Sequence, residues 1–373
     1  METPSNRDVN RQGDAARELH PERCVALRSR VCSCRRCVDV CTTRAIRVEE
    51  GKLSFDECSC TTCGACAAAC PTGAIVMLCP SDKELDASLR HTLACGGATA
   101  TVACRHAGTI APTDTARTDG TDTCRVPCLG RVDVSLLLGL AAQGASSIEL
   151  VSGRCPACAN ARGGAAARQV VREAQALLEA CGSQTCIELL ERGDADKDGG
   201  ASGSSTPMAV GTDAERLVVT GPIKPDAQTR RLPCHVPARR LRLFRNIKAL
   251  GSPSSKSVQT HETFSLVIDT SACTGCGGCG FLCPTGALRL IEEDNGGKLL
   301  AHAPALCVAC GLCEQSCPRQ AISSTPEVRL DRFIEQQPDV FPLADDAWVP
   351  NRPRSMFEKL HQVLGANVVM STS

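Results

Sequence analysis

The spacing of the cysteines is the feature of this sequence that most directly predicts chemistry. Three stretches follow the pattern C-x2-C-x2-C-x3-C-P, and a shorter copy precedes the first of them. In this pattern three close cysteines hold one [4Fe–4S] cluster, and the fourth reaches a neighbouring cluster. The spacing therefore predicts a redox protein. The complete motifs consist of Cys60, Cys63, Cys66, Cys70 and Pro71; Cys273, Cys276, Cys279, Cys283 and Pro284; and Cys307, Cys310, Cys313, Cys317 and Pro318.

The two motifs nearest the C-terminus predict two complete clusters. Each cluster takes three ligands from one motif and its fourth from the other. A zinc knuckle or free thiols would be the alternative, but three matches to this pattern are too many to arise by chance among 28 cysteines. The predicted ligand sets are Cys273, Cys276, Cys279 and Cys317 for one cluster, and Cys283, Cys307, Cys310 and Cys313 for the other.

The first complete motif and the shorter copy before it predict one full ligand set and one that lacks a member. The full set is Cys41, Cys60, Cys63 and Cys66, and the other contains Cys34, Cys37 and Cys70. The expected first ligand of the second set falls on Val31. Only one residue separates Cys32 from Cys34, whereas Cys24 can reach the site from a separate loop. We therefore favour Cys24, and an incomplete or [3Fe–4S] cluster is the alternative.

Residues 90–192 have a different character and alternate between strands and helices. Strands are predicted over 98–104, 124–127, 147–152 and 185–190, and helices over 132–143 and 165–181. This order predicts a small parallel sheet, whose sites form beyond the carboxyl ends of the strands. The cysteines expected at that edge suit a [2Fe–2S] cluster or a zinc ion equally. They are Cys104, Cys128, Cys155 and Cys158.

Two family resemblances rest on these motifs. The four cysteine motifs resemble bacterial-type 2[4Fe–4S] ferredoxins in two copies. The run VPCLGRVDVSLLLGLAAQGASSIELVSGRCPACANARGG resembles the delta subunit of methyl viologen-reducing hydrogenase. The second resemblance implies a [2Fe–2S] cluster on Cys104, Cys128, Cys155 and Cys158, although the first cysteine loop is reduced here. It also implies partners such as a hydrogenase, a formate dehydrogenase or a heterodisulfide reductase-like flavoprotein.

The expected fold is α+β and α/β multidomain, with two ferredoxin-like dicluster domains flanking a small parallel-sheet α/β domain. Each dicluster domain is an internal repeat of a cysteine loop, a short helix and a strand. The segment 216–262 is basic around Arg230–Lys248 and reads as irregular chain. The predicted boundaries are 20–80 and 263–325 for the dicluster domains, 90–192 for the central domain, 193–262 for a linker and 326–373 for a tail with a short helix near 355–364.

The composition and the N-terminal sequence limit the partners and the cell compartment that are expected for this redox chemistry. The 41 basic and 41 acidic residues cancel, which predicts no general attraction to nucleic acid. No run of 18 apolar residues predicts a membrane span. The first residues contain neither an apolar stretch nor a twin-arginine pair, which predicts that the protein stays in the cytoplasm. In that reducing compartment the cysteines are expected to be metal ligands rather than disulfides.

The leading functional hypothesis is an iron–sulfur electron-transfer protein, or the subunit that connects the redox centres of a larger oxidoreductase. Electrons would pass from one ferredoxin pair through the central site to the other pair. No nucleotide, flavin or nucleophile–base signature predicts bond chemistry in this chain. One alternative is a maturation factor for a molybdenum enzyme that docks through the basic segment 230–248. Another is a thiol-redox protein that uses Cys155 and Cys158.

Overall fold

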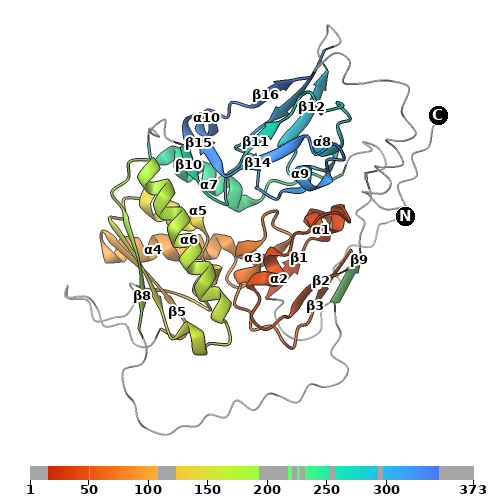
Figure 1. Cartoon of the computed structure of the whole chain (residues 1–373). Helices are drawn as coiled ribbons and strands as arrows, with labels where there is room; N and C mark the ends of the chain where they lie inside the picture. Colours follow the sequence, from red (N-terminus) through yellow and green to blue (C-terminus); the bar gives the residue numbers. More distant parts are fainter. Residues whose placement is uncertain are drawn as a thin grey trace, which may run out of the picture.

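Three groups of elements form one packed molecule (Figure 1). The computed structural model describes residues 16–49, 51–107, 123–192, 217–220, 225–226, 232–251, 257–292 and 297–343. The first part of the predicted linker, residues 193–215, and the helix predicted near 355–364 lie outside the described residues. None of the helices in the described ranges combines the length and the apolar character that a bilayer crossing requires.

The N-terminal domain repeats a cysteine loop, a short helix and a strand, as its sequence predicts. Its outer strands β1 and β4 pair antiparallel, and β2, β3 and the distant β9 form a second small sheet. The elements are β1 (Arg17–Leu19), η1 (Pro21–Arg23), α1 (Val25–Arg28), α2 (Arg36–Val40), β2 (Ile46–Glu49), β3 (Lys52–Phe55), α3 (Ala65–Ala69), β4 (Ile75–Met77) and β9 (Leu217–Thr220).

The C-terminal dicluster domain has the same plan. Strands β11 and β14 pair antiparallel, and β12, β13 and β16 form an antiparallel sheet. Three of the short helices after cysteine loops have as their N-cap residue a glycine with positive φ, where a side chain would strain the backbone. These glycines are Gly64, Gly277 and Gly311. The elements are β11 (Ser265–Ile268), α8 (Gly278–Leu282), β12 (Leu288–Glu292), β13 (Lys298–His302), α9 (Leu312–Ser316), β14 (Ile322–Thr325) and β16 (Asp339–Pro342).

The central domain is the parallel sheet that the alternating pattern predicts, with the strand order β6-β5-β7-β8. Val102 and Leu150 on its middle strands are fully buried, as are Leu137 and Leu138 on α5. Burial of this aliphatic core is the main stabilising contribution of the domain. Its elements are α4 (Asp82–Gly96), β5 (Thr99–Cys104), β6 (Thr123–Val126), η2 (Leu129–Arg131), α5 (Val134–Ala142), β7 (Ser147–Ser152), η3 (Cys155–Ala157), α6 (Ala161–Ala180) and β8 (Cys186–Glu191).

Helix α4 was not among the predicted elements, although the sequence carries its start signal. The Ser81 hydroxyl accepts a hydrogen bond from the Glu84 amide, and the Glu84 carboxylate accepts one from the Ser81 amide. This capping box satisfies two backbone donors that the helix leaves free at its first turn. Leu85, Leu89 and Leu93 then follow at helical spacing and join the central core.

The segment predicted to be irregular contains a helix, α7 (Ala238–Ala249), and this corrects the expectation. Leu243 and Ile247 lie on one face and pack into the central core, so the helix has the amphipathic pattern that its many arginines obscured. Three small elements of the C-terminal half pack beside it on the same core. They are β10 (Ser257–Gln259), β15 (Glu327–Arg329) and α10 (Leu330–Ile334).

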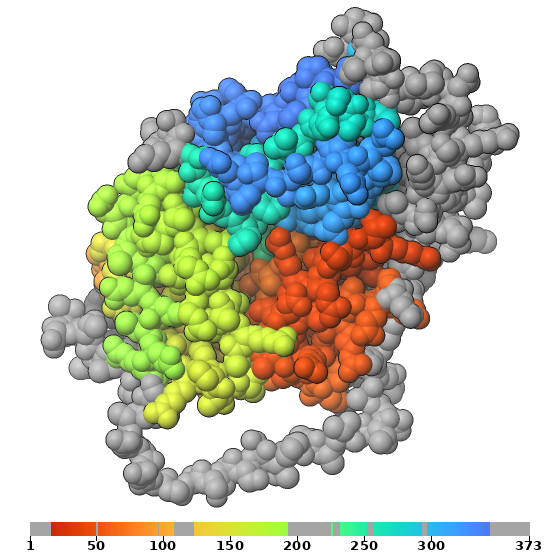
Figure 2. Space-filling view, in the orientation of Figure 1, coloured from red at the N-terminus to blue at the C-terminus, as the bar shows by residue number. Residues whose placement is uncertain are grey.

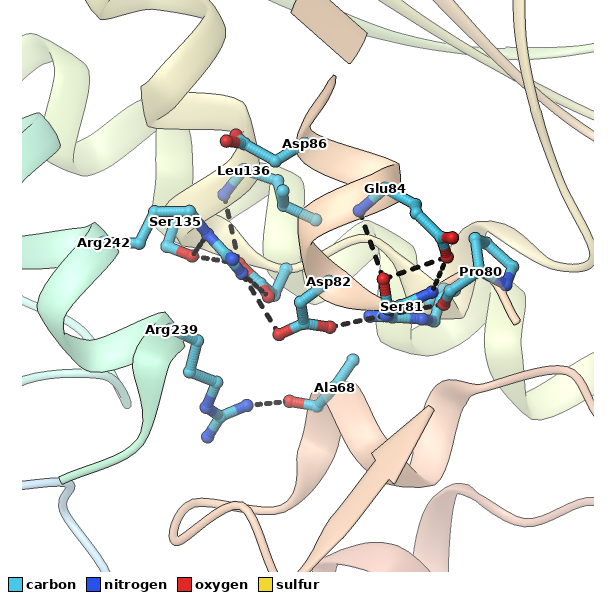
Figure 3. Close-up of polar contacts among 12 residues, drawn as sticks. Ala68, Pro80, Ser81, Asp82, Glu84, Asp86, Ser135, Leu136, Arg239 and Arg242 are labelled. Carbon is cyan, nitrogen blue, oxygen red and sulfur yellow. Dashed lines mark hydrogen bonds and ion pairs between the residues drawn. The ribbon is translucent and has the colours of Figure 1, made fainter. Parts of the chain in front are cut away.

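Polar contacts attach α7 to the N-terminal and central domains (Figure 3). Arg242 donates to a carboxylate oxygen of Asp133 at 2.9 Å and to the Ser135 hydroxyl at 2.8 Å, and it lies 3.6 Å from Asp82. Three residues earlier on the same helix, Arg239 donates to the Ala68 carbonyl in the N-terminal domain. Helix α7 therefore connects the N-terminal and central domains.

The two dicluster domains pack directly against each other. In Figure 2 the red N-terminal domain lies beneath the blue C-terminal domain, with the yellow-green central domain beside them. Arg36 donates to the Ala309 carbonyl at 2.7 Å, and the Ser33 amide donates to the Gln315 side chain at 2.8 Å. Arg28, which is 1% exposed, donates to the Leu282 carbonyl at 3.5 Å. The two dicluster domains, which the central domain separates in the sequence, are thus neighbours in space.

Candidate iron–sulfur sites

Four hollows lined by thiols coincide with the four ferredoxin ligand sets predicted from spacing. We name each by one of its cysteines. The Cys24 cavity contains Cys24, Cys34, Cys37 and Cys70, and the Cys60 cavity contains Cys41, Cys60, Cys63 and Cys66. The Cys273 cavity contains Cys273, Cys276, Cys279 and Cys317, and the Cys307 cavity contains Cys283, Cys307, Cys310 and Cys313. Each cavity combines cysteines from two motifs.

Cys24, and not Cys32, lines the first of these cavities. Burial, and then the charge of Cys70, raise the pKa of the Cys24 thiol to about 12. Cys32 instead packs with Phe281 and Cys310 against an apolar cluster shared with the C-terminal domain. The geometry is therefore compatible with Cys24 as the fourth ligand, which remains a prediction.

Backbone amides point at several of the sulfurs. The Thr62 amide donates to Cys60 Sγ at 3.3 Å, and the Ala74 amide donates to Cys70 Sγ at 3.2 Å. Arg17 adds a side-chain donor to Cys60 Sγ at 3.0 Å. Such donors stabilise negative charge on sulfur, so the donor set fits an anionic iron–sulfur cluster.

Burial makes bare thiolates unfavourable in these cavities. It raises the pKa of Cys66 and of Cys279 to about 12, and the charges of neighbouring cysteines add to the effect. A cationic metal centre removes this penalty because it replaces the lost solvation, and its binding releases the thiol protons. The cavities are thus suited to cysteines that are ligated.

Cys307 is the exception, since its pKa lies below the ordinary value. Burial raises this pKa, but the His302 ring, the Ala309 amide and Arg240 together outweigh burial. The His302 ring is fully buried, and its Nδ1 lies 3.5 Å from an Asp339 carboxylate oxygen. Neither ring nitrogen has a partner with full hydrogen-bond geometry among the described residues.

The central thiols gather at the carboxyl edge of the parallel sheet. Cys104 ends β5, Cys128 follows β6, and Cys155 and Cys158 follow β7. We call these four residues the Cys128 group. Burial, and then the charges of Cys63, Cys104 and Cys155, raise the pKa of Cys128 to about 12, which indicates that these sulfurs are close together. Amides of Gly130, Gly153 and Asn160 donate to Cys128, Cys104 and Cys158 at 3.3–3.4 Å.

The first turn of α6 lies against two sulfurs of this group. A Cβ at Gly163 would overlap Cys128 Sγ, and a Cβ at Gly164 would lie 2.6 Å from Cys155 Sγ. The sequence analysis did not identify these two glycines as part of the site. The signal that could have identified them is a pair of glycines at helix positions where alanine is ordinarily favoured. Among the described residues, no three His, Cys, Asp or Glu side chains converge as a site for a single metal ion.

The Cys128 group lies beside the Cys60 cavity. Cys63 is the first of the cysteines whose charge raises the pKa of Cys128. Thr61 donates to the Asn160 side chain at 2.6 Å, and Arg162 donates to the Cys41 carbonyl at 3.3 Å. These contacts join the cysteine loop of one domain to the sheet edge of the other.

The Cys24 cavity in turn lies beside the Cys307 cavity. Arg28 stands between them: burial lowers its pKa, while the negative charges of Cys234, Cys283, Cys310 and Cys24 oppose that shift. Within each dicluster domain the two cavities are also neighbours, as the charge effects of Cys66 on Cys37 and of Cys279 on Cys313 indicate. The five thiol sites therefore form a series, in the order Cys128, Cys60, Cys24, Cys307 and Cys273.

Comparison with known families agrees with this geometry. The family described as 4Fe-4S dicluster domain matches residues 31–74 and 272–321. The family described as methyl-viologen-reducing hydrogenase, delta subunit, matches residues 100–193. These matches cover the two dicluster domains and the central sheet, respectively.

Two archaeal proteins from Methanocaldococcus jannaschii are similar to parts of the chain. An uncharacterized ferredoxin is 37% identical over 57 residues, which is 15% of this chain and 73% of that protein. Pyruvate synthase subunit PorD is 30% identical over 77 residues, which is 21% of this chain and 85% of that protein. No solved structure matches the chain. The chain thus belongs to the [4Fe–4S] dicluster ferredoxins, as an iron–sulfur electron-transfer protein with a hydrogenase delta-subunit domain between its two dicluster domains.

Proposed function

We propose that this protein is the subunit that connects the redox centres of a larger oxidoreductase and relays electrons between a catalytic partner and an acceptor. The observation that carries the proposal is the series of five thiol sites. Successive sites in the series are neighbours, and together they extend through all three domains. A protein that held clusters only for its own stability would have no need to bring them together in this way.

The proposed cofactors are four [4Fe–4S] clusters in the four cavities and one [2Fe–2S] cluster on the Cys128 group. When bound, these clusters supply reversible one-electron transfer. The chain's own residues hold the ligands in place, surround them with apolar side chains and direct amides at the sulfurs. Phe55 and Met77 do so at the Cys60 cavity, and Leu300 and Ile322 at the Cys273 cavity.

The contacts support an order that differs from the order along the chain. The sequence suggests that the central site stands between two ferredoxin pairs. The contacts of Arg28 and Arg36 instead join the two dicluster domains directly, which leaves the Cys128 group at one end of the series and the Cys273 cavity at the other. We propose that electrons enter and leave through these two ends.

The partner is proposed from the matching families. The delta-subunit match supports a hydrogenase as the partner. A formate dehydrogenase or a heterodisulfide reductase-like flavoprotein is proposed from the family resemblance alone. The similarity to a pyruvate synthase subunit adds a second kind of oxidoreductase with a ferredoxin-type subunit. A docking role for the basic segment 230–248 in a maturation factor has less support, since Arg240 and Arg242 are buried inside the molecule.

The thiol-redox alternative also has less support. A reactive cysteine needs a lowered pKa, whereas burial raises the pKa of Cys155. The Gly164 backbone also approaches its sulfur closely, which restricts attack by a second thiol. If Cys155 and Cys158 were a redox pair, a Cys155→Ala variant would keep the iron content of the parent chain.

Iron and sulfide analysis of anaerobically purified protein, with EPR of the reduced state, tests the proposal. We expect about 18 irons per chain with the central cluster present, and about 16 if only the four cavities are filled. EPR should show several interacting reduced clusters. A preparation that contains zinc and little iron would overturn the electron-transfer proposal.

A further inference from the structure

The charge next to the first cysteine differs among the three complete motifs. Four residues before Cys60 stands Asp56, and four residues before Cys273 stands Asp269. The Asp56 carboxylate accepts hydrogen bonds from the Cys58 and Ser59 amides at 3.1 and 3.2 Å. Asp269 accepts equivalent bonds from the Ser271 and Ala272 amides at 3.0 and 3.1 Å. In both loops a carboxylate therefore closes the turn that leads to the ligand.

The loop before Cys307 has no such carboxylate, and an arginine side chain donates hydrogen bonds to it instead. Ala303 occupies the matching position, and the next residue, Pro304, has no amide to donate. Arg240 on α7 donates to the Pro304 carbonyl at 2.6 Å and to the Ala305 carbonyl at 2.9 Å. The Cys307 amide donates to the same Pro304 carbonyl at 3.2 Å, so one oxygen joins Arg240 to the ligand's backbone.

The Arg240 charge is buried and has neutral hydrogen-bond partners. The side chain is 3% exposed, donates to the Glu262 backbone carbonyl at 2.5 Å and lies over the Phe333 ring at 4.9 Å. Burial lowers the pKa of the guanidinium to about 10, so it remains charged at neutral pH. The negative charge of Cys307 opposes this lowering more than that of Glu262 does. Cys307 is therefore the main electrostatic partner of Arg240.

We propose that Arg240 is a positioning residue that raises the reduction potential at the Cys307 cavity above that at the Cys273 cavity. The proposal rests on the function proposed above, because it requires clusters at both sites. Reduction adds a negative charge, and a buried cation stabilises that charge strongly because little solvent screens it. At the Cys273 cavity the matching group is the Asp269 carboxylate, which closes the turn before Cys273 and whose negative charge opposes reduction. Electrons would then collect at the Cys307 cavity.

An EPR-monitored redox titration of the full chain tests this assignment. We expect Arg240→Met to move one of the one-electron steps to a more negative potential and to leave the other steps in place. Arg240→Lys keeps the charge and should retain most of the parent potential. Arg245→Met, an exposed position on the same helix, should move no step. Iron content and the thermal unfolding midpoint are recorded for each variant.

A second variant at the other site keeps the proposal falsifiable if Arg240→Met does not fold. Asp269→Asn preserves the acceptor oxygen of the turn but removes its charge. At low ionic strength, where screening is weak, it should move a different step to a more positive potential. The proposal is overturned if iron-replete Arg240→Met shifts no step, if Met and Lys shift it equally, or if Asp269→Asn leaves every step unchanged. Absence of iron in the parent chain would instead contradict the proposed function.

Discussion

At the scale of single residues, the cysteines of the first motif show how local spacing and tertiary position combine. The spacing from Cys34 to Cys37 and from Cys60 to Cys66 identifies the short-range members of each set, since these residues share a loop. The remaining ligand of each set does not lie at a fixed distance along the sequence from these residues. Cys24 lies at the start of α1 and reaches the cavity from outside the motif, whereas Cys32 contacts the other dicluster domain.

A pair of cysteine variants distinguishes the two candidates. We expect Cys24→Ala to lose up to about four irons per chain, or one iron if a [3Fe–4S] cluster forms instead. Cys32→Ala should keep the iron content of the parent protein because its sulfur lies outside the cavity. Anaerobic iron analysis and EPR measure both outcomes, and loss of iron in Cys32→Ala alone would reverse the assignment.

At the scale of secondary structure, helices α6 and α7 place backbone and charge where the sites need them. Helix α6 lays its first turn on the Cys128 group, and α7 inserts arginines between domains. The helical periodicity of a sequence predicts only which face of a helix is apolar, so it predicts neither of these contacts. Both depend on which neighbour each polar position contacts after folding.

A glycine substitution tests the role of α6. Alanine in place of glycine ordinarily stabilises a helix by about 1 kcal/mol. We expect Gly163→Ala to do the reverse, because its Cβ would overlap Cys128 Sγ, and to reduce the iron and sulfide bound by the central domain. Gly278→Ala is the matched control, since its Cβ would lie at an ordinary 3.7 Å from Cys276 Sγ. Unchanged iron content in Gly163→Ala would exclude a ligand role for Cys128.

The buried ion pair of α7 predicts a large loss of stability when it is broken. Burial raises the pKa of Asp133, but Arg242, helped by Arg239, Arg131 and the Ser135 hydroxyl, outweighs burial, and the pKa is lowered. Arg242→Met would leave this carboxylate buried without its cation, at a cost of about 3–5 kcal/mol. The exposed Arg245→Met should change stability by less than about 0.5 kcal/mol. Urea unfolding under anaerobic conditions compares the two, and similar midpoints would show that the pair contributes little.

At the scale of the whole molecule, direct contact between the dicluster domains sets the order of the sites. We expect Arg36→Glu to weaken this contact, because it removes the hydrogen bond to Ala309 and places a carboxylate against a carbonyl. Amide hydrogen exchange should then increase over 28–37 and 309–316. Arg35→Glu changes a neighbouring side chain that is 55% exposed and should leave exchange unchanged. Equal exchange in both variants would contradict the interface.

How much of this arrangement can be predicted from sequence depends on the range of the interactions. The ferredoxin repeats and the parallel sheet were predicted because motif spacing and strand–helix alternation are local signals. The sequence also contains the capping box that begins α4, but this helix was not predicted. Helix α7 was predicted as irregular because its arginines look solvated until Asp133 and the Pro304 carbonyl are in place. The packing of one dicluster domain on the other depends on contacts such as Ser33 with Gln315, for which no local pattern exists.

The position of Arg28 has a consequence for how the protein is made. Its guanidinium is buried, and its carbonyl partners include Pro233 and Leu282, which are 205 and 254 residues further along the chain. The N-terminal domain therefore leaves the ribosome long before these acceptors are synthesised. Until then, the face beside the Cys24 cavity is open to water and oxygen, and its charge has no buried partner. We expect the cell's cluster-assembly machinery to meet the Cys24 cavity in this open state, before translation completes the interface that closes it.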